Sequence, residues 1–134
     1  MDPLLRTKRQ RTEQIPRCIC EHKSSHLSIG SACSGWCSEL FAAVKLRLKF
    51  QACFACEKCP IIAELNHSLW SHHLYFEDMM SQDFMSLSPT VDLFLAGTPC
   101  QGYSAQGLGL GIDDPRGLLF YQALLWIKSH APKT

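Results

Sequence analysis

The sequence contains no long apolar run and no leader of the exported type. None of its apolar stretches approaches the roughly 20 residues that a membrane-spanning helix needs. The amino-terminal residues are charged, and they lack the apolar segment and the small-residue cleavage site of a secretory signal. We therefore expect a soluble intracellular protein, in the nucleus or the cytoplasm, without membrane contact.

Charge is also scarce, and it is unevenly placed. Charged residues make up 19% of the 134 residues and hydrophobic residues 46%, which is ordinary for one globular domain. Residues 1–25 hold six Lys or Arg and three acids, whereas residues 26–134 hold seven and nine. The body lacks the concentrated positive charge of a duplex-binding protein. We expect residues 1–25 to be a basic, disordered arm, either solvated, touching phosphate or carrying a nuclear address, and residues 26–134 to form one domain.

The eight cysteines do not form the pattern of a disulfide framework, because the chain is long for one and has no export signal. Cys53, Cys56 and Cys59 have a spacing that can bind zinc or an iron–sulfur cluster, but no second cysteine pair follows at zinc-finger spacing. The other candidate ligands would have to fold back onto them: Cys18, Cys20, His22 and His26. We expect thiols and no metal.

Short apolar runs alternate with helical patterns along the body of the chain. Residues 27–39 predict a strand, a tight turn and a helix start, residues 51–57 a second strand, and the run from Val91 a later one. Helices are expected over 39–49, over 60–73 with Pro60 at the first position, and over 115–130. The expected order is strand, helix, strand, helix, strand, loop, strand and helix. This alternation predicts an α/β fold, a parallel sheet with flanking helices.

The run from Val91 leads into a loop that carries a cysteine. Pro99 fixes the backbone directly before Cys100, and Gly and Ser residues follow it. Since ligands bind at the carboxyl ends of parallel strands, Cys100 is placed where a nucleophile would be presented.

A nucleotide site is predicted at the same edge. The turn at Gly35 follows the first strand, and Glu57 comes 22 positions later, at the end of the second. A nucleotide-binding βαβ unit places an acid about 20 residues beyond its glycine turn, where it binds the ribose hydroxyls.

The sequence Pro99-Cys100-Gln101, followed by Ser104, Gly107, Gly109 and the Asp-Pro-Arg-Gly-Leu-Leu of residues 114–119, resembles the catalytic loop of the cytosine-5 DNA methyltransferases. The resemblance implies a partial Rossmann-like methyltransferase fold that uses S-adenosylmethionine. It implies that Cys100 is the nucleophile, preceded by Pro99, and that Gln101 and Ser104 position the loop and nearby phosphate or cofactor. By the same resemblance, Arg116 holds the loop to the next helix.

The family's cofactor loop, aligned on Gly35, puts Ser31 at its acid, Cys33 at its Phe, and Cys37 and Ser38 at its last two glycines. Side chains at glycine positions are expected to adopt a different turn or to narrow the pocket, which would weaken binding. For the acid beside the adenine, Asp78 is the best match and Glu77 its close competitor. The resemblance thus implies these cofactor contacts: Cys33, Ser34, Gly35, Trp36, Glu57, Asp78, Gly97 and Pro99.

Several family motifs have no counterpart in these 134 residues. No Glu-Asn-Val follows Cys100, since Glu77 is the last glutamate, and Gln-x-Arg-x-Arg and a target-recognition segment are missing. We expect an incomplete catalytic domain that is inactive alone and acts on DNA with a polypeptide supplying the missing motifs. Two alternatives stay open: a transfer-RNA cytosine-5 methyltransferase, and a non-catalytic interaction remnant of the fold.

Overall fold

The computed structural model describes residues 26–107 and 109–134, so the basic arm expected over residues 1–25 lies outside the described part. Four parallel strands form one sheet in the order β3-β2-β1-β4. The strands are β1 (Leu27–Ala32), β2 (Phe50–Cys56), β3 (Leu74–Phe76) and β4 (Leu93–Ala96). The helices are α1 (Ser38–Lys45), α2 (Pro60–Leu69), α3 (Gln82–Leu87), the 3-10 turn η2 (Gly111–Asp113) and α4 (Gly117–His130).

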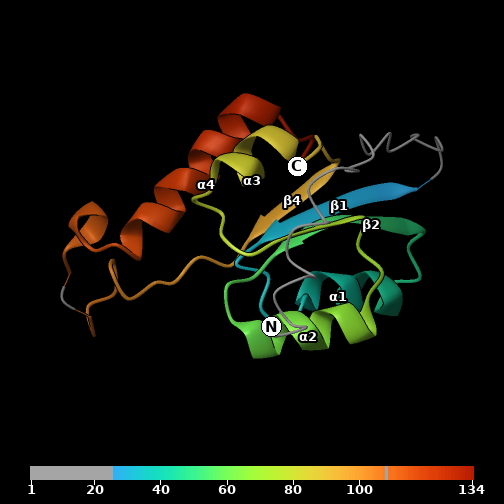
Figure 1. Ribbon diagram of the computed structural model, residues 1–134, viewed down its shortest axis with the longest axis horizontal. Helices are drawn as coiled ribbons and strands as arrows, with labels where there is room; N and C mark the ends of the chain where they lie inside the picture. Colours follow the sequence, from blue (N-terminus) through green and yellow to red (C-terminus); the bar gives the residue numbers. More distant parts are fainter. Residues whose placement is uncertain (1–25, 108) are drawn as a thin grey trace, which may run out of the picture.

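Helices cover both faces of this sheet. Figure 1 shows α1 and α2 on one face and α3 and α4 on the other, with the long loop between β4 and α4 extending away from the sheet. The parallel sheet with flanking helices confirms the predicted α/β class and fits a partial Rossmann-like methyltransferase fold. No described helix is long and apolar enough to cross a membrane.

Aromatic rings fill the layer between the sheet and the α3–α4 face. Phe54 of β2 lies at the centre, 5.6 Å from the Trp126 ring of α4 and 5.9 Å from Phe84 of α3, measured between ring centroids. A Cβ at Gly30 would lie 2.2 Å from the Phe54 ring, so only glycine lets this ring lie across β1. The Trp126 indole N–H donates to the Ser88 hydroxyl at 2.7 Å, which satisfies its polar atom inside the core.

The opposite layer is smaller and more polar. Leu40 and Ala43 of α1 are buried against the sheet, and Phe41 meets Trp70 edge to face at 4.9 Å. Five side-chain atoms here are buried without a hydrogen-bond partner among the described residues; they belong to Glu39, Asn66, Trp70, His72 and Tyr75.

The helices are shorter than the sequence predicts. The prediction over 60–73 was wrong at its end, because Trp70 is extended (φ −131°) and the His73 N–H donates to the Ala52 carbonyl, bringing the chain to the edge of β2. The prediction over 39–49 was wrong after Lys45, since Arg47 takes a left-handed conformation (φ 55°). The expected loop before β4 contains α3, which is capped by the Ser81 hydroxyl.

Candidate active site

Cys100 lies four positions after the end of β4, on the surface. Its carbonyl accepts the backbone N–H groups of Tyr103 and Ser104 at 2.9 and 2.8 Å, so the chain turns tightly just after the thiol. The Ser104 hydroxyl accepts the Gln106 N–H at 3.2 Å, and Gln101 is exposed. This turn holds Cys100 at the carboxyl edge of the sheet with its side chain open to solvent.

An ion pair orders the chain just before α4. Asp114 is 3% exposed, and its carboxylate accepts the Arg116 backbone N–H at 2.9 Å and two guanidinium N–H groups at 2.9 and 2.6 Å. These hydrogen bonds from Arg116 lower the pKa of Asp114 to about 2. Gly117 follows, where a Cβ would lie 1.9 Å from the Gly111 carbonyl oxygen, so α4 begins in direct contact with η2.

The loop after β1 uses left-handed backbone at three positions. Cys33, Gly35 and Cys37 have φ values of 48°, 50° and 52°. Cys37 stands where the family has glycine; its side chain is fully buried, with Sγ 3.9 Å from Nε2 of His72, and it lines neither of the two clefts beside this loop. The loop therefore accommodates the Cys37 Cβ without narrowing those clefts.

Ser34 and Glu57 join this loop to the end of β2. The Ser34 hydroxyl accepts the Cys56 N–H at 3.0 Å, and the Ser34 N–H donates to the Cys56 carbonyl at 2.9 Å. One oxygen of Glu57 accepts the Gly35 N–H at 2.8 Å, and the other accepts the Cys59 N–H at 2.9 Å. Both oxygens keep a second lone pair, so the loop orients the carboxylate and leaves it able to accept from a ligand.

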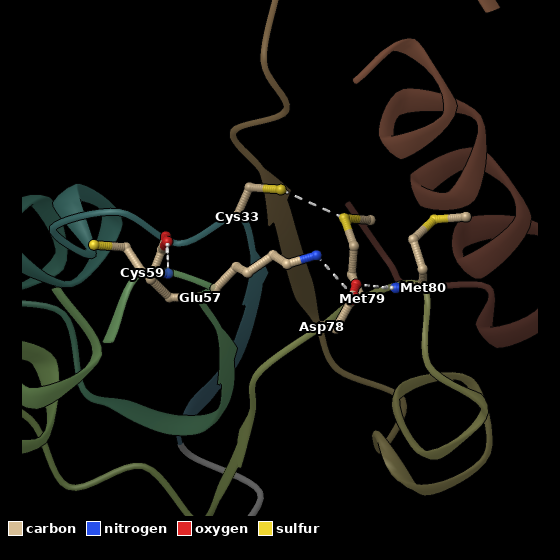
Figure 2. Close-up of polar contacts among 7 residues, drawn as sticks. Cys33, Glu57, Cys59, Asp78, Met79 and Met80 are labelled. Carbon is tan, nitrogen blue, oxygen red and sulfur yellow. Dashed lines mark hydrogen bonds and ion pairs between the residues drawn. The ribbon is translucent and has the colours of Figure 1, made fainter. Parts of the chain in front are cut away.

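Asp78 lies in the segment after β3, beside Met79 and Met80 (Figure 2). One of its oxygens accepts the Met80 N–H at 2.9 Å, and the other pairs with the Lys58 ammonium at 3.3 Å. The Met80 N–H and Lys58 lower the pKa of Asp78. In the same view Cys33 points toward Met79, and their sulfur atoms are 3.4 Å apart.

These side chains surround a cleft of about 520 Å³. The β1 loop, the ends of β2 and β3, the residues after β4 and the start of α4 all contribute to its lining: Cys33, Gly35, Cys56, Glu57, Lys58, Glu77, Asp78, Met79, Met80, Gly97, Pro99, Pro115, Arg116 and Leu119. We call it the acidic cleft. Burial, followed by the charges of Glu57 and Asp78, raises the pKa of the Cys33 thiol to about 11. Because Pro99 lines the cleft, its wall ends one residue before Cys100.

Comparison with known proteins identifies the family. Residues 38–134 match the family model described as C-5 cytosine-specific DNA methylase. The chain belongs to this family. Two relatives align with about 100 residues: the type II methyltransferase M.DsaV of Dactylococcopsis salina (34% identity, 71% of this chain, 28% of that protein) and M.HaeII of Haemophilus aegyptius (33%, 71% and 31%). M.NgoBI of Neisseria gonorrhoeae is 47% identical over 45 residues, which are 34% of this chain and 14% of that protein. The chain thus spans less than a third of the length of these relatives.

The structure of this cytosine-5 methylase domain brings most of the sequence-predicted residues together. Arg116 and the predicted cofactor contacts Cys33, Gly35, Glu57, Asp78, Gly97 and Pro99 line the acidic cleft. Ser34 and Trp36 do not; they line a neighbouring cleft of about 610 Å³, and Trp36 is 61% exposed. Cys100, Gln101 and Ser104 line neither cleft.

Sequence reasoning missed several lining residues. Lys58 follows Glu57 directly but belongs to no motif, and its pairing with Asp78 depends on the contact between β2 and β3. Tyr103 and Phe120 form a pocket with Cys100 that only the folded loop shows. In the described part of the chain, no three His, Cys, Asp or Glu side chains gather in a way that could hold a metal ion.

Proposed function

We propose that this chain carries the cofactor cleft and the nucleophile of a DNA cytosine-5 methyltransferase. In this proposal, a methyl group passes from S-adenosylmethionine to carbon 5 of cytosine while Cys100 is bonded to the ring. The observation that carries the proposal is the exposed Cys100 thiol, one residue beyond the Pro99 wall of an acidic cleft. The family's own description, as a cytosine-specific DNA methylase, favours DNA over RNA as the substrate.

The acidic cleft suits S-adenosylmethionine in size and in chemistry. Its volume of about 520 Å³ falls within the range of small-molecule sites. The cofactor has ribose hydroxyls, which donate hydrogen bonds, and a positively charged sulfonium. Carboxylate oxygens accept hydrogen bonds from the hydroxyls and attract the sulfonium charge. Glu57 would accept the ribose hydroxyls and Asp78 would lie beside the adenine, with Glu77 as its competitor in the same cleft. When bound, the cofactor supplies the methyl group that carbon 5 takes up.

The remaining cofactor roles belong to the walls. Cys33, Gly35, Gly97 and Pro99 would form the surface against which the cofactor lies. Ser34 would hold the loop to β2 through the Cys56 backbone, and Trp36 would cover the loop from the neighbouring cleft. Because Cys33, Gly35 and Gly97 line both clefts, the two adjoin between the β1 loop and the end of β4.

Covalent catalysis explains why a thiol is needed. Carbon 5 of neutral cytosine is a poor nucleophile, so the Cys100 thiolate first bonds to carbon 6, and the ring electrons move toward carbon 5. After methyl uptake, carbon 5 loses its proton to a base, the sulfur–carbon 6 bond breaks, and the thiolate is restored. Pro99, Gln101 and Ser104 would position the loop, and Arg116 would hold it to α4. The target base must leave the DNA stack to reach the thiol.

The first test is complementation. We expect no methyl transfer from this chain alone, because its residues after Cys100 include no glutamate to serve as the ring's proton partner. Adding a polypeptide with Glu-Asn-Val, recognition and C-terminal segments should produce transfer of labelled methyl to cytosine oligonucleotides. Cys100→Ser should abolish transfer, whereas Cys18→Ser, a matched cysteine change in residues 1–25, should leave it within about twofold.

Trapping with 5-fluorocytosine tests whether Cys100 is the nucleophile, and RNA oligonucleotides test whether the substrate is DNA or RNA. Fluorine at carbon 5 cannot leave as a proton does, so a DNA adduct at Cys100 should accumulate and be seen by mass spectrometry. Transfer to RNA oligonucleotides alone would assign the substrate to RNA. A complemented enzyme that methylates DNA equally well with Cys100→Ser would contradict the nucleophile assignment.

A further inference from the structure

A third pocket is lined by Cys100 itself and is distinct from the two clefts described above. It measures about 360 Å³ and is lined by Thr98, Pro99, Cys100, Tyr103 and Phe120. Pro99 lies between this pocket and the acidic cleft and contributes to both. We call this space the aromatic pocket, because two rings form one of its sides.

Both rings are held in place although they are exposed. Tyr103 is 48% exposed and Phe120 47%, and they meet edge to face at 5.8 Å with an interplanar angle of 70°. The Tyr103 hydroxyl donates to the Gly117 carbonyl at 3.1 Å, while its backbone N–H donates to the Cys100 carbonyl at 2.9 Å. The loop and α4 thus fix one ring from both of its ends.

The chemistry of the aromatic pocket favours a flat, uncharged ligand. None of its five lining residues carries a charge, so phosphate has no partner there. The Tyr103 hydroxyl proton is already donated to Gly117, which leaves the ring faces and the Thr98 side chain for contact. Nucleobases of any sequence stack on such rings, because every base has a π-face.

We propose that the aromatic pocket holds a nucleobase that neighbours the target cytosine in the same DNA strand. Tyr103 and Phe120 are then positioning residues, since they stack on the neighbouring base and bring the strand to the thiol without contacting the reacting atoms. The uncharged aromatic lining indicates a nucleobase as the ligand. Because Cys100 itself lines the pocket, that base must lie next to the cytosine that the thiol attacks. The identification of that strand as DNA rests on the proposed function.

Alkylation of Cys100 tests the pocket without any turnover. We expect N-benzyliodoacetamide to modify Cys100 with a rate that saturates with concentration, and iodoacetamide to react with a linear dependence. The preference is the rate of Cys100 alkylation by N-benzyliodoacetamide divided by the rate with iodoacetamide. Phe120→Ala and Tyr103→Ala should each lower this preference about tenfold, which corresponds to about 1.4 kcal/mol. Tyr103→Phe keeps the ring and should keep most of the preference.

Tyr121→Ala is the matched control, because Tyr121 is 53% exposed on the same helix and lines no part of the pocket. It should leave the preference unchanged. If Tyr121→Ala lowered it as much as Phe120→Ala, or if the benzyl reagent showed no saturation, the pocket would not be a binding site for planar groups.

The trapped DNA complex tests the identity of the ligand. With 2-aminopurine placed next to 5-fluorocytosine, we expect quenched fluorescence in the Cys100 adduct and recovery in Tyr103→Ala and Phe120→Ala. Adduct formation with fluorescence that these variants do not change would overturn the stacking proposal and leave the proposed function intact. Absence of any adduct would instead contradict the proposed function, while the alkylation preference would still report on the pocket.

Discussion

Cys100 is exposed, whereas the other described cysteines are buried or half-buried. Burial, followed by nearby negative charge, raises the pKa of Cys37 and of Cys56 to about 12. A thiol with that pKa has about a thousandfold less thiolate than an ordinary thiol near 9, and burial also blocks access. We therefore predict that a mild alkylating agent modifies Cys100 first, and Cys37 and Cys56 at least about a hundredfold more slowly. Peptide mapping by mass spectrometry measures the order, and a slow Cys100 would show that the loop does not present its thiol.

His72 makes stability depend on pH. Burial, and then the charges of His67 and His73, lower its pKa from 6.5 to about 4, so the unfolded chain binds more protons than the folded one between those values. The free energy of unfolding should be unaffected by this group above about pH 6.5 and should fall as pH drops toward 4. Between about pH 7 and 5 the free energy of unfolding should fall by about 1 kcal/mol. The full pKa shift would give a larger fall, but His72 is partly exposed and solvent screens its interactions.

Urea unfolding of variants at these two pH values checks the assignment. His72→Gln should remove this part of the decline, and His26→Gln, a change at an exposed histidine outside the His67–His73 group, should not. Asp114 adds nothing in this window, because its pKa is lowered to about 2 and its contribution is lost only below its ordinary value near 3.8. An unchanged decline in His72→Gln would show that another group is responsible.

The contact between η2 and α4 is possible because Gly117 has no side chain. A Cβ at Gly117 would lie 1.9 Å from the Gly111 carbonyl oxygen, so the helix start or the turn must move. We predict that Gly117→Ala lowers the free energy of unfolding by about 2–3 kcal/mol, the upper part of the range for core overpacking. Gly109→Ala is the control: no atom lies within 4 Å, and its left-handed backbone (φ +63°) should cost about 1 kcal/mol. Equal losses in urea denaturation would mean that the close contact does not exist.

Elements that local patterns define could be predicted from the sequence. Apolar runs placed β1, β2 and β4, and Pro60 placed the start of α2. The ends of α1 and α2 could not be predicted, since they depend on Arg47 entering the left-handed region and on His73 pairing with Ala52 across the sheet. The bond from His73 to Ala52 is a tertiary contact that overrides the local helical pattern, whereas the end of α1 is local, with the Leu48 N–H donating to the Ala43 carbonyl at 3.0 Å.

Some features of the candidate site could also be predicted from the sequence, and others depend on contacts between elements. In a parallel sheet all carboxyl ends share one edge, so Glu57 and Pro99 could be placed together from the strand pattern, whereas Asp78 was added by the family resemblance. The pairing of Lys58 with Asp78 and the aromatic pocket could not, because they join residues from separate elements. Met80 is 47% exposed and lines the acidic cleft, where its backbone N–H donates to the Asp78 carboxylate.

At the scale of the whole molecule, the acidic cleft joins four strand ends to the start of α4, so a ligand bound there should stabilise the entire fold. Because Ser38 stands at a family glycine position and lines the neighbouring cleft, we expect weak binding of S-adenosylmethionine, with Kd about 0.1 mM. A cofactor concentration about tenfold above Kd should then add about 1.4 kcal/mol to the free energy of unfolding and raise Tm by several degrees. Glu57→Gln should largely remove this rise, and Glu64→Gln, an exposed acid of α2, should keep it. Thermal unfolding with and without cofactor measures both. Submicromolar binding that survives Glu57→Ala would show that neither this carboxylate nor the altered loop governs the affinity.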